Sequence, residues 1–331
     1  MNSSVDETRI RREEIAFHSQ GVTLAGTLHL PASDPPHPAV VMLQGSGVAD
    51  RDGGGYFPPI RDAFLRRGIA VYSFDKPGIG GSTGDWRHFA LFDRADQAQA
   101  ALTLLKAHTA VDSRRVGVWG QSQGGWIVQL VASRTDDLAF AITNSGPAIS
   151  PREQDIYGVE HTMRADGRST EDVERAVVFE HALHEAATRG DDFATVSSAL
   201  LHEAMSQPWS GYHALVDAED WAMMCRFMAE RYEPAEALAQ IRCPFLAIFG
   251  ELDPLLPARE SALICGQALR KADNADATLV LFPQGNHHIM LADSSEFVPG
   301  YLDLLADWAA HRVPEVQAGS ETPRSVGSAG P

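Results

Sequence analysis

Cysteine and long apolar runs are both scarce in this sequence, and each shortage excludes a class of protein. The three cysteines, Cys225, Cys243 and Cys265, are too few and too scattered for a disulfide framework or a zinc site. No run approaches the ~18 apolar residues of a membrane span. Basic residues are also few, with 27 lysines and arginines against 44 aspartates and glutamates, which gives a formal net charge of −17. This excess of acid argues against a nucleic-acid or anionic-membrane partner.

The two ends of the chain add little to a folded core. Residues 1–14 are polar and charged, and they lack the apolar segment of a secretory signal peptide. Together with the few cysteines, this favours a reducing compartment, and we expect a cytoplasmic protein. The segment 313–331 ends in a stretch rich in Gly, Ser and Pro, and we expect a disordered tail there.

Between these ends, short apolar runs of strand length alternate with stretches of helix length. Residues 15–30 predict two strands around Gln20-Gly21, and continuous apolar runs predict further, fully buried strands. Such runs, separated by helices, are typical of a parallel sheet that helices cover on both faces. We therefore expect an α/β fold with a mostly parallel central sheet, formed by residues 15–149 and 240–312. The apolar runs lie at 39–43, 69–74, 116–119, 139–143, 245–249 and 278–282, with helices expected at about 59–67 and 92–108.

Residues 150–239 interrupt this alternation with a long helical pattern and no convincing strand. We expect a helical cap, inserted over the carboxyl ends of the strands. Each of its large aromatic and methionine side chains has two possible roles, packing between cap and core or lining a substrate pocket, since such pockets are mostly apolar and lie at domain interfaces. The pocket candidates are Trp209, Tyr212 and Trp221 in this segment, together with Trp126 beside the predicted elbow.

The segment from Val116 to Trp126 carries the strongest chemical motif. Within it, Gly120-Gln121-Ser122-Gln123-Gly124 matches the G-x-S-x-G pattern of a nucleophile elbow. A serine on a sharp strand-to-helix turn needs neighbours without a Cβ, because the two backbones come close together there. The following helix would direct its N–H groups and the positive end of its dipole toward the site of a forming oxyanion. A Gly-rich turn with an ordinary surface serine is the alternative interpretation.

A reactive serine needs an adjacent base that a third group orients. In open α/β sheets these side chains follow the carboxyl ends of strands. Asp253, after the run 245–249, is the candidate acid, with Glu251 as its competitor. His287, after the next run, is the candidate base, and His288 is an equally placed alternative. The serine, the aspartate and the histidine then follow one another in the order expected for an elbow of this type.

An oxyanion hole needs two backbone donors. One is expected from the N–H of Gln123, which follows the nucleophile, and the other from the loop after the run 39–43. In that loop, Gln44-Gly45-Ser46-Gly47 lets the backbone approach a substrate closely, and the N–H of Ser46 is the first choice. The same glycines would also suit a simple tight turn.

No cofactor and no metal are expected. The segment 78–84 is rich in glycine and follows a strand, but it lacks the third glycine of a dinucleotide fingerprint and the lysine of a P-loop. The adjacent His287 and His288 do not form a metal site, because neighbouring side chains diverge and no third ligand has a recognisable spacing.

Three segments together resemble α/β-hydrolases of the serine esterase type. They are the elbow 120–126, the loop 44–52 with Asp50-Arg51-Asp52, and the segment 75–86. The resemblance covers roughly residues 15–312, and it is closest to the branch related to prolyl-oligopeptidase and acyl-CoA thioesterase or acyltransferase catalytic domains. The resemblance implies the following roles: nucleophile Ser122, base His287, acid Asp253, and oxyanion donors Ser46 and Gln123.

Two positions depart from the pattern of the resembled family. Gln44-Gly45 stands where that family usually has His-Gly, and Pro77 stands where many relatives carry Arg. The first departure falls in the expected oxyanion loop, and neither touches the expected triad.

We therefore expect a serine hydrolase that cleaves a small-molecule carboxylic ester or lactone through an acyl-Ser122 intermediate. An acyl-CoA thioesterase or acyltransferase on the same triad is the first alternative. A non-catalytic small-molecule receptor on the same scaffold is less favoured, because all three triad side chains are present.

Overall fold

The computed structural model describes residues 10–213, 217–292 and 294–314. The expected N-terminal extension lies outside these residues up to position 9, and the expected tail does so from position 315 onward. Within the described ranges, no helix combines the length and the apolar character that crossing a membrane would require.

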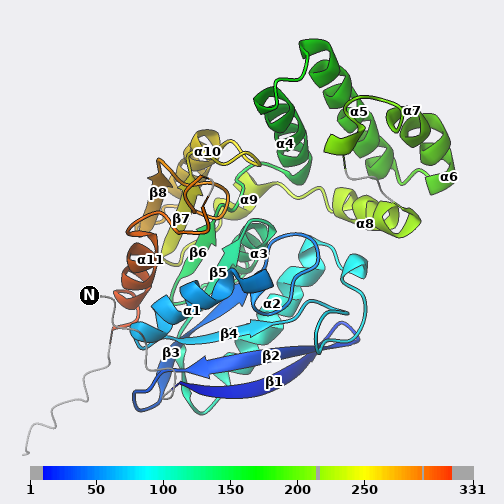
Figure 1. Cartoon of the computed structure of the whole chain (residues 1–331). Coiled ribbons are helices and arrows are strands. Elements are labelled where there is room, and N and C mark those ends of the chain that lie inside the picture. Colours follow the sequence, from blue (N-terminus) through cyan, green and yellow to red (C-terminus); the bar gives the residue numbers. More distant parts are fainter. Residues whose placement is uncertain (1–9, 214–216, 293, 315–331) are drawn as a thin grey trace, which may run out of the picture.

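In the described part of the chain, eight strands form one sheet in the order β1-β2-β4-β3-β5-β6-β7-β8 (Figure 1). β1 and β2 are antiparallel to each other and β2 is antiparallel to β4, whereas all other neighbours are parallel. The predicted α/β fold with a mostly parallel sheet is confirmed. The strands are β1 (Arg11–Ser19), β2 (Val22–Leu30), β3 (His37–Leu43), β4 (Ala70–Phe74), β5 (Val111–Gln121), β6 (Ala141–Asn144), β7 (Phe245–Gly250) and β8 (Ala277–Phe282).

The first two strands form the predicted hairpin, which turns at Gln20-Gly21. Both turn residues have positive φ, 50° and 79°, as a tight two-residue hairpin turn requires. β1 begins at Arg11, four positions before the predicted start at 15, and Arg11 pairs with Leu30. The early residues of this edge strand are polar and mostly exposed, so no apolar pattern marks them as a strand.

Two apolar clusters cover the two faces of the sheet, and successive residues of β3 alternate between them. Val41 and Leu43 pack against the helices of one face, whereas Val40 and Met42 pack against those of the other. The first face carries α2 (Leu91–Lys106), α3 (Gln123–Ser133), α9 (Pro234–Leu238) and α10 (Ala258–Lys271), and the second carries α1 (Phe57–Arg66) and α11 (Tyr301–Ala310).

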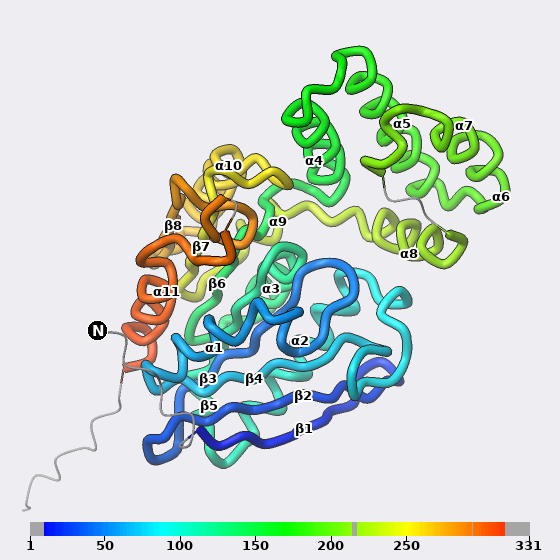
Figure 2. Tube along the Cα trace, in the orientation of Figure 1, coloured from blue at the N-terminus to red at the C-terminus, as the bar shows by residue number. Residues whose placement is uncertain are grey.

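A helical insertion, residues 151–229, separates β6 from β7 in the sequence. It forms a lobe beyond one end of the sheet, which the chain enters before α4 and leaves after α8 (Figure 2). Its helices share an apolar cluster of their own, which includes Phe179, Leu183 and Trp221. α9 falls within the predicted cap range but packs with α3 and α10. The helices of the insertion are α4 (Pro151–Ala165), α5 (Thr170–Arg189), α6 (Phe193–Val196), α7 (His202–Ala204) and α8 (Ala218–Ala229).

Candidate active site

Ser122 lies on the turn between β5, which ends at Gln121, and α3, which begins at Gln123. Its backbone has φ 54° and ψ −120°, a conformation that residues with side chains rarely adopt. The Ser122 N–H donates a 2.9 Å hydrogen bond to the carbonyl oxygen of Asn144 at the end of β6. The strand, turn and helix that the motif predicts are therefore present, with Ser122 at the amino end of α3.

The glycines beside Ser122 lie where backbone segments leave no room for a Cβ. A Cβ on Gly120 would lie 2.2 Å from the carbonyl oxygen of Gly124. A Cβ on Gly124 would lie 2.4 Å from the carbonyl oxygen of Leu43, at the end of β3. The turn is thus packed directly against the neighbouring strand, which holds the unusual Ser122 conformation in place.

Asp253 and His287 form a buried pair on the loops that follow β7 and β8. The Nδ1 atom of His287 lies 2.7 Å from Oδ2 of Asp253, and the two residues are only 6% and 3% exposed. The other oxygen of Asp253 accepts hydrogen bonds from the N–H groups of Leu255, at 2.8 Å, and Leu256, at 3.3 Å. Among the described residues, no hydrogen bond joins Ser122 to His287.

The two loops are held together through Gly250, the last residue of β7. A Cβ at this position would lie 2.2 Å from the carbonyl oxygen of Asn286, immediately before His287. Leu252 N–H also donates a 2.9 Å hydrogen bond to the carbonyl oxygen of Gly285. These contacts fix the spacing of the loops, and with it the contact between the carboxylate and the imidazole.

The competing residues of the sequence analysis have other partners. The ring of His288 packs edge-on against Tyr56, with 4.9 Å between ring centroids, and Tyr56 Oη donates to the His288 carbonyl oxygen at 2.9 Å. Burial and the neighbouring His287 lower the pKa of His288. Glu251 forms an ion pair with the exposed Arg259. Of the four candidates, the structure brings together Asp253 and His287.

The loop after β3 lies against the elbow. A Cβ on Gly45 would lie 3.3 Å from the Cβ of Ser122. Ser46 and Gln123 line the same cavity as Ser122. In the described ranges, neither of their backbone N–H groups donates a hydrogen bond within the protein. Both groups are therefore free to bind a ligand oxygen.

Two buried side chains hold this loop in place through hydrogen bonds to backbone carbonyl oxygens. Gln44, which occupies the position of the usual histidine, donates from Nε2 to the carbonyl oxygens of Asp50, at 3.0 Å, and Phe74. Lys76 donates from Nζ to the carbonyl oxygens of Gly45 and Gly47. Burial lowers the pKa of Lys76 well below its ordinary value. No expectation from the sequence named Lys76, although it lies two positions after a buried strand, in one of the segments that carry the family resemblance.

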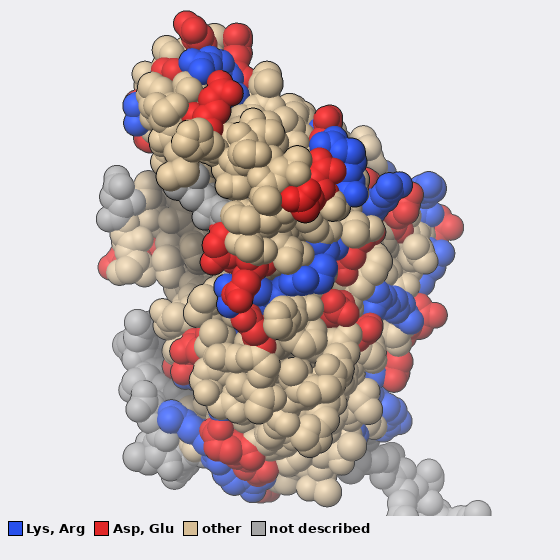
Figure 3. Space-filling model, turned by 90° about the vertical axis from the view of Figure 1, so that its right-hand side faces the viewer, with Lys and Arg blue, Asp and Glu red and all other residues tan. Residues whose placement is uncertain are grey.

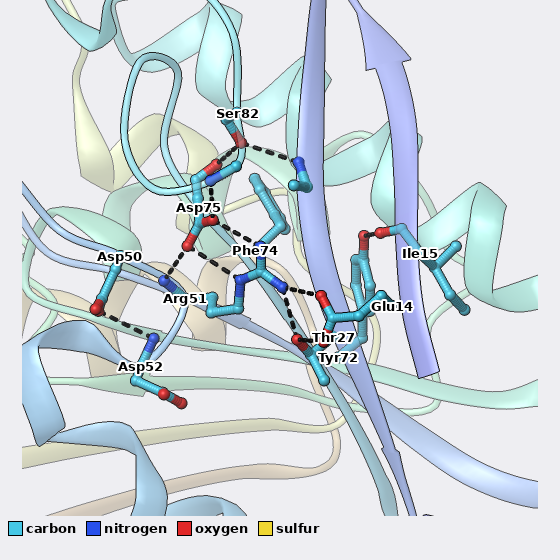
Figure 4. Close-up of polar contacts among 12 residues, drawn as sticks. Glu14, Ile15, Thr27, Asp50, Arg51, Asp52, Tyr72, Phe74, Asp75 and Ser82 are labelled. Atoms are coloured by element: carbon cyan, nitrogen blue, oxygen red, sulfur yellow. Dashed lines mark hydrogen bonds and ion pairs between the residues drawn. The ribbon is translucent and has the colours of Figure 1, made fainter. Parts of the chain in front are cut away.

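An Arg51–Asp75 ion pair joins two of the segments on which the family resemblance rests (Figure 4). Arg51 Nη2 lies 2.7 Å from Asp75 Oδ2, and the same carboxylate accepts from the N–H groups of Arg51 and Gly81. Burial would raise the pKa of Asp75, but the hydrogen bonds from Arg51 outweigh it and lower the pKa. Ser82 Oγ bonds both the Asp75 carbonyl oxygen and the Ala25 N–H, so the glycine-rich segment is tied to the sheet.

A cavity of about 640 Å³ opens at Ser122 and extends along the helical insertion. Two of the predicted pocket residues, Trp126 and Tyr212, line it. The prediction for Trp209 and Trp221 needs correction, because both are buried in the apolar cluster of the insertion and do not line this cavity. The lining residues that the sequence analysis did not assign include Trp86, Asp155, Glu180, Leu183, Met223, Met224, Phe227 and Met228.

The described residues contain no group of three or more His, Cys, Asp or Glu side chains arranged to hold a metal ion. The chemistry that the arrangement offers is that of a serine hydroxyl with a carboxylate-oriented imidazole on a nearby loop, and with free backbone N–H donors beside the serine.

Comparison with known proteins extends these observations. The chain is 25% identical over 295 residues to esterase FrsA of Yersinia pestis, covering 86% of this chain but only 58% of FrsA. It is 22% identical over 252 residues to an uncharacterized 31.7 kDa protein of Escherichia coli, covering 75% of this chain and 83% of that protein. A Pyrococcus furiosus esterase, Pf2001, has a similar fold, with a TM-score of 0.61 at 16% identity over 95% of this chain and 96% of that one.

The family match covers most of the folded chain. A family model described as serine aminopeptidase, S33, matches residues 34–294, from the loop before β3 to the segment beyond His287. This range includes the elbow, the Arg51–Asp75 pair and the Asp253–His287 pair. The chain therefore belongs to the serine aminopeptidase S33 family of α/β hydrolases.

Proposed function

We propose that this hydrolase cleaves carboxylic esters or lactones through an acyl intermediate on Ser122. The observation that carries the proposal is the buried contact between His287 Nδ1 and Asp253 Oδ2. The loops that carry these two residues follow the carboxyl ends of their strands, as the strained Ser122 turn does. A carboxylate at Nδ1 leaves Nε2 of His287 as the proton acceptor and stabilises the imidazolium that forms.

The reaction would begin when Ser122 Oγ attacks the carbonyl carbon of the ester and His287 Nε2 takes the hydroxyl proton. The N–H groups of Ser46 and Gln123 would hold the oxyanion of the tetrahedral intermediate. His287 would then give its proton to the leaving alcohol, which leaves an acyl-serine ester. A water molecule, deprotonated by the same imidazole, would attack that ester and release the acid.

The missing hydrogen bond between Ser122 and His287 is compatible with this sequence of steps. Catalytic hydrogen bonds are often long or poorly aligned in a free enzyme and tighten when substrate is bound. The single contact that must already be present is the one that orients the base, and Asp253 supplies it at 2.7 Å.

The test compares Ser122→Ala with the unchanged protein on 4-nitrophenyl acyl esters of increasing chain length. We expect loss of nearly all turnover, and loss of labelling by a fluorophosphonate probe that reacts with activated serines. The matched 4-nitroanilides measure amide cleavage, the reaction of an aminopeptidase, after which the family is named. Undiminished ester turnover by Ser122→Ala would refute the proposal, and preference for the anilides would replace it by a peptidase function.

A further inference from the structure

The cavity at Ser122 contains charged side chains of one sign only. Among its lining residues in the described part of the chain, Asp155, Glu180 and Asp220 are acidic, and none is lysine or arginine. The outer face in Figure 3 differs, because acidic and basic side chains lie side by side on it. The single sign inside the cavity therefore does not simply follow from the acidic composition of the chain.

Glu180, on α5, already has partners inside the protein. His213 Nδ1 forms a hydrogen bond with its Oε1 atom, and His184 Nε2 lies 3.4 Å from Oε2. Burial acts to raise the pKa of Glu180, but the two histidines outweigh it and lower the pKa to about 2. The carboxylate is ionised, and the two imidazoles offset its burial.

Asp155, on α4, is different. In the described residues its carboxylate accepts no hydrogen bond, and its nearest basic atom is Nε2 of His184, at 3.5 Å, which also faces Glu180. The side chain is 55% exposed although it lies in the cavity, so a ligand can reach it. The protein atoms around this carboxyl desolvate it in part, which raises its pKa above the ordinary value. A carboxylate in these surroundings gains more from a cation than one on the open surface does.

The rest of the cavity wall suits the same kind of ligand. Phe227 offers an aromatic ring, whose face attracts cations. Trp86 and Tyr212 also line the cavity, but basic side chains of the protein already lie over a face of each ring. Met224 and Met228 add polarisable thioether groups. An apolar ligand would need only the apolar part of this wall. It would also shield the Asp155 carboxylate from water without providing an opposite charge, which is unfavourable.

We propose that this cavity selects esters that carry a positively charged nitrogen, as a protonated amine or a quaternary ammonium group. Asp155 binds the cation while the aromatic and methionine side chains surround it. The inference rests on the proposed function in one respect, namely that the bound ester reacts at Ser122. Binding of the cation itself does not depend on catalysis.

The kinetic test uses two esters of the same shape, benzoylcholine and 3,3-dimethylbutyl benzoate, in which carbon replaces the charged nitrogen. We expect the unchanged protein to prefer benzoylcholine by about 10-fold or more in kcat/KM. Asp155→Asn should lose this preference, so that the two esters have nearly equal kcat/KM. Glu160→Gln is the matched control on α4, because Glu160 pairs with Arg164 on the surface, and it should behave like the unchanged protein.

The binding test separates this proposal from the proposed hydrolysis. Calorimetric titration of benzyltrimethylammonium into Ser122→Ala protein should give an affinity about 10-fold higher than titration into the Ser122→Ala/Asp155→Asn double variant. Asp155→Ser is a second variant if Asp155→Asn does not fold. If neither ester is cleaved, this binding difference decides the proposal. Equal binding by both proteins, or an equal preference for the two esters with and without Asp155, would overturn it.

Discussion

Lys76 and Gly47 are joined by a hydrogen bond of 2.7 Å, from the buried Nζ atom to a carbonyl oxygen of the loop that follows β3. A second bond from the same Nζ reaches Gly45. Ser46, whose N–H is an expected oxyanion donor, stands between the two carbonyl groups. Because the Gly45 carbonyl and the Ser46 N–H belong to the same peptide group, the lysine fixes the direction of this donor.

Replacing Lys76 by methionine should lower kcat by about 10-fold or more with little change in KM, because a looser donor stabilises the transition state less. Steady-state kinetics on a 4-nitrophenyl ester measure both constants. Lys106→Met is the control, because Lys106 pairs with Asp137 near the surface. A change in KM alone would mean that Lys76 shapes the cavity and does not position the donor.

His287→Ala should reduce kcat by about 10³-fold or more, since His287 is the base in every proton transfer of the proposed reaction. His288→Ala should stay within a few-fold, because the His288 ring packs on Tyr56 and its contact with that hydroxyl is made by the backbone. Parallel assays of the two variants, with thermal unfolding as a check on folding, provide the measurement. If His288→Ala were the inactive variant, the base assignment would pass to that residue.

The preference for a cationic ester should depend on pH through Asp155. Partial desolvation in the cavity raises the pKa of this half-exposed carboxyl above its ordinary value, while His184 lowers it and Glu180 raises it. Below its pKa the carboxyl takes up a proton and loses its attraction for a cation. The ratio of kcat/KM for benzoylcholine to that for 3,3-dimethylbutyl benzoate should therefore rise with pH, with a midpoint above the ordinary pKa of an aspartate. A ratio that is flat in the unchanged protein, or that still rises in Asp155→Asn, would contradict this.

Gly124→Ala should destabilise the protein by roughly 1–3 kcal/mol, because the new Cβ would overlap the carbonyl oxygen of Leu43. Gly266→Ala is the opposite case. Gly266 lies within α10, and a Cβ there would have its nearest neighbour at an ordinary 3.6 Å, so the exchange should stabilise by about 0.5–1 kcal/mol. Urea unfolding of the two variants gives both values, and equal effects would show that the elbow can relax around a side chain.

The sequence predicted the sheet because most buried strands are short apolar runs that a helix follows, whereas β2 leads directly to β3. It missed the first residues of β1, since an edge strand needs no apolar pattern. It supplied Ser122 from a motif, and Asp253 and His287 from their order along the chain. It could not separate His287 from His288, because only the loop geometry decides which ring reaches the carboxylate.

The cavity was harder to predict than the strand ends. An aromatic residue in a helical pattern suits a pocket and an apolar cluster equally well, so Trp209 and Trp221 were assigned to the wrong one of the two. Asp155 belongs to no motif, and Lys76 lies in the segment 75–86 without a pattern that marks its role. Their importance comes from the surroundings that distant segments create, which a single sequence does not display.

The separate apolar cluster of the helical insertion has an evolutionary consequence. Trp221, Phe179 and their neighbours stabilise α5 and α8 from within the lobe, while the sheet beneath has clusters of its own. Substitutions on the cavity side of α4 and α8 thus affect a different apolar cluster from substitutions around Ser122. Such a lobe can be re-specialised for new ligands while the chemistry beneath it stays intact.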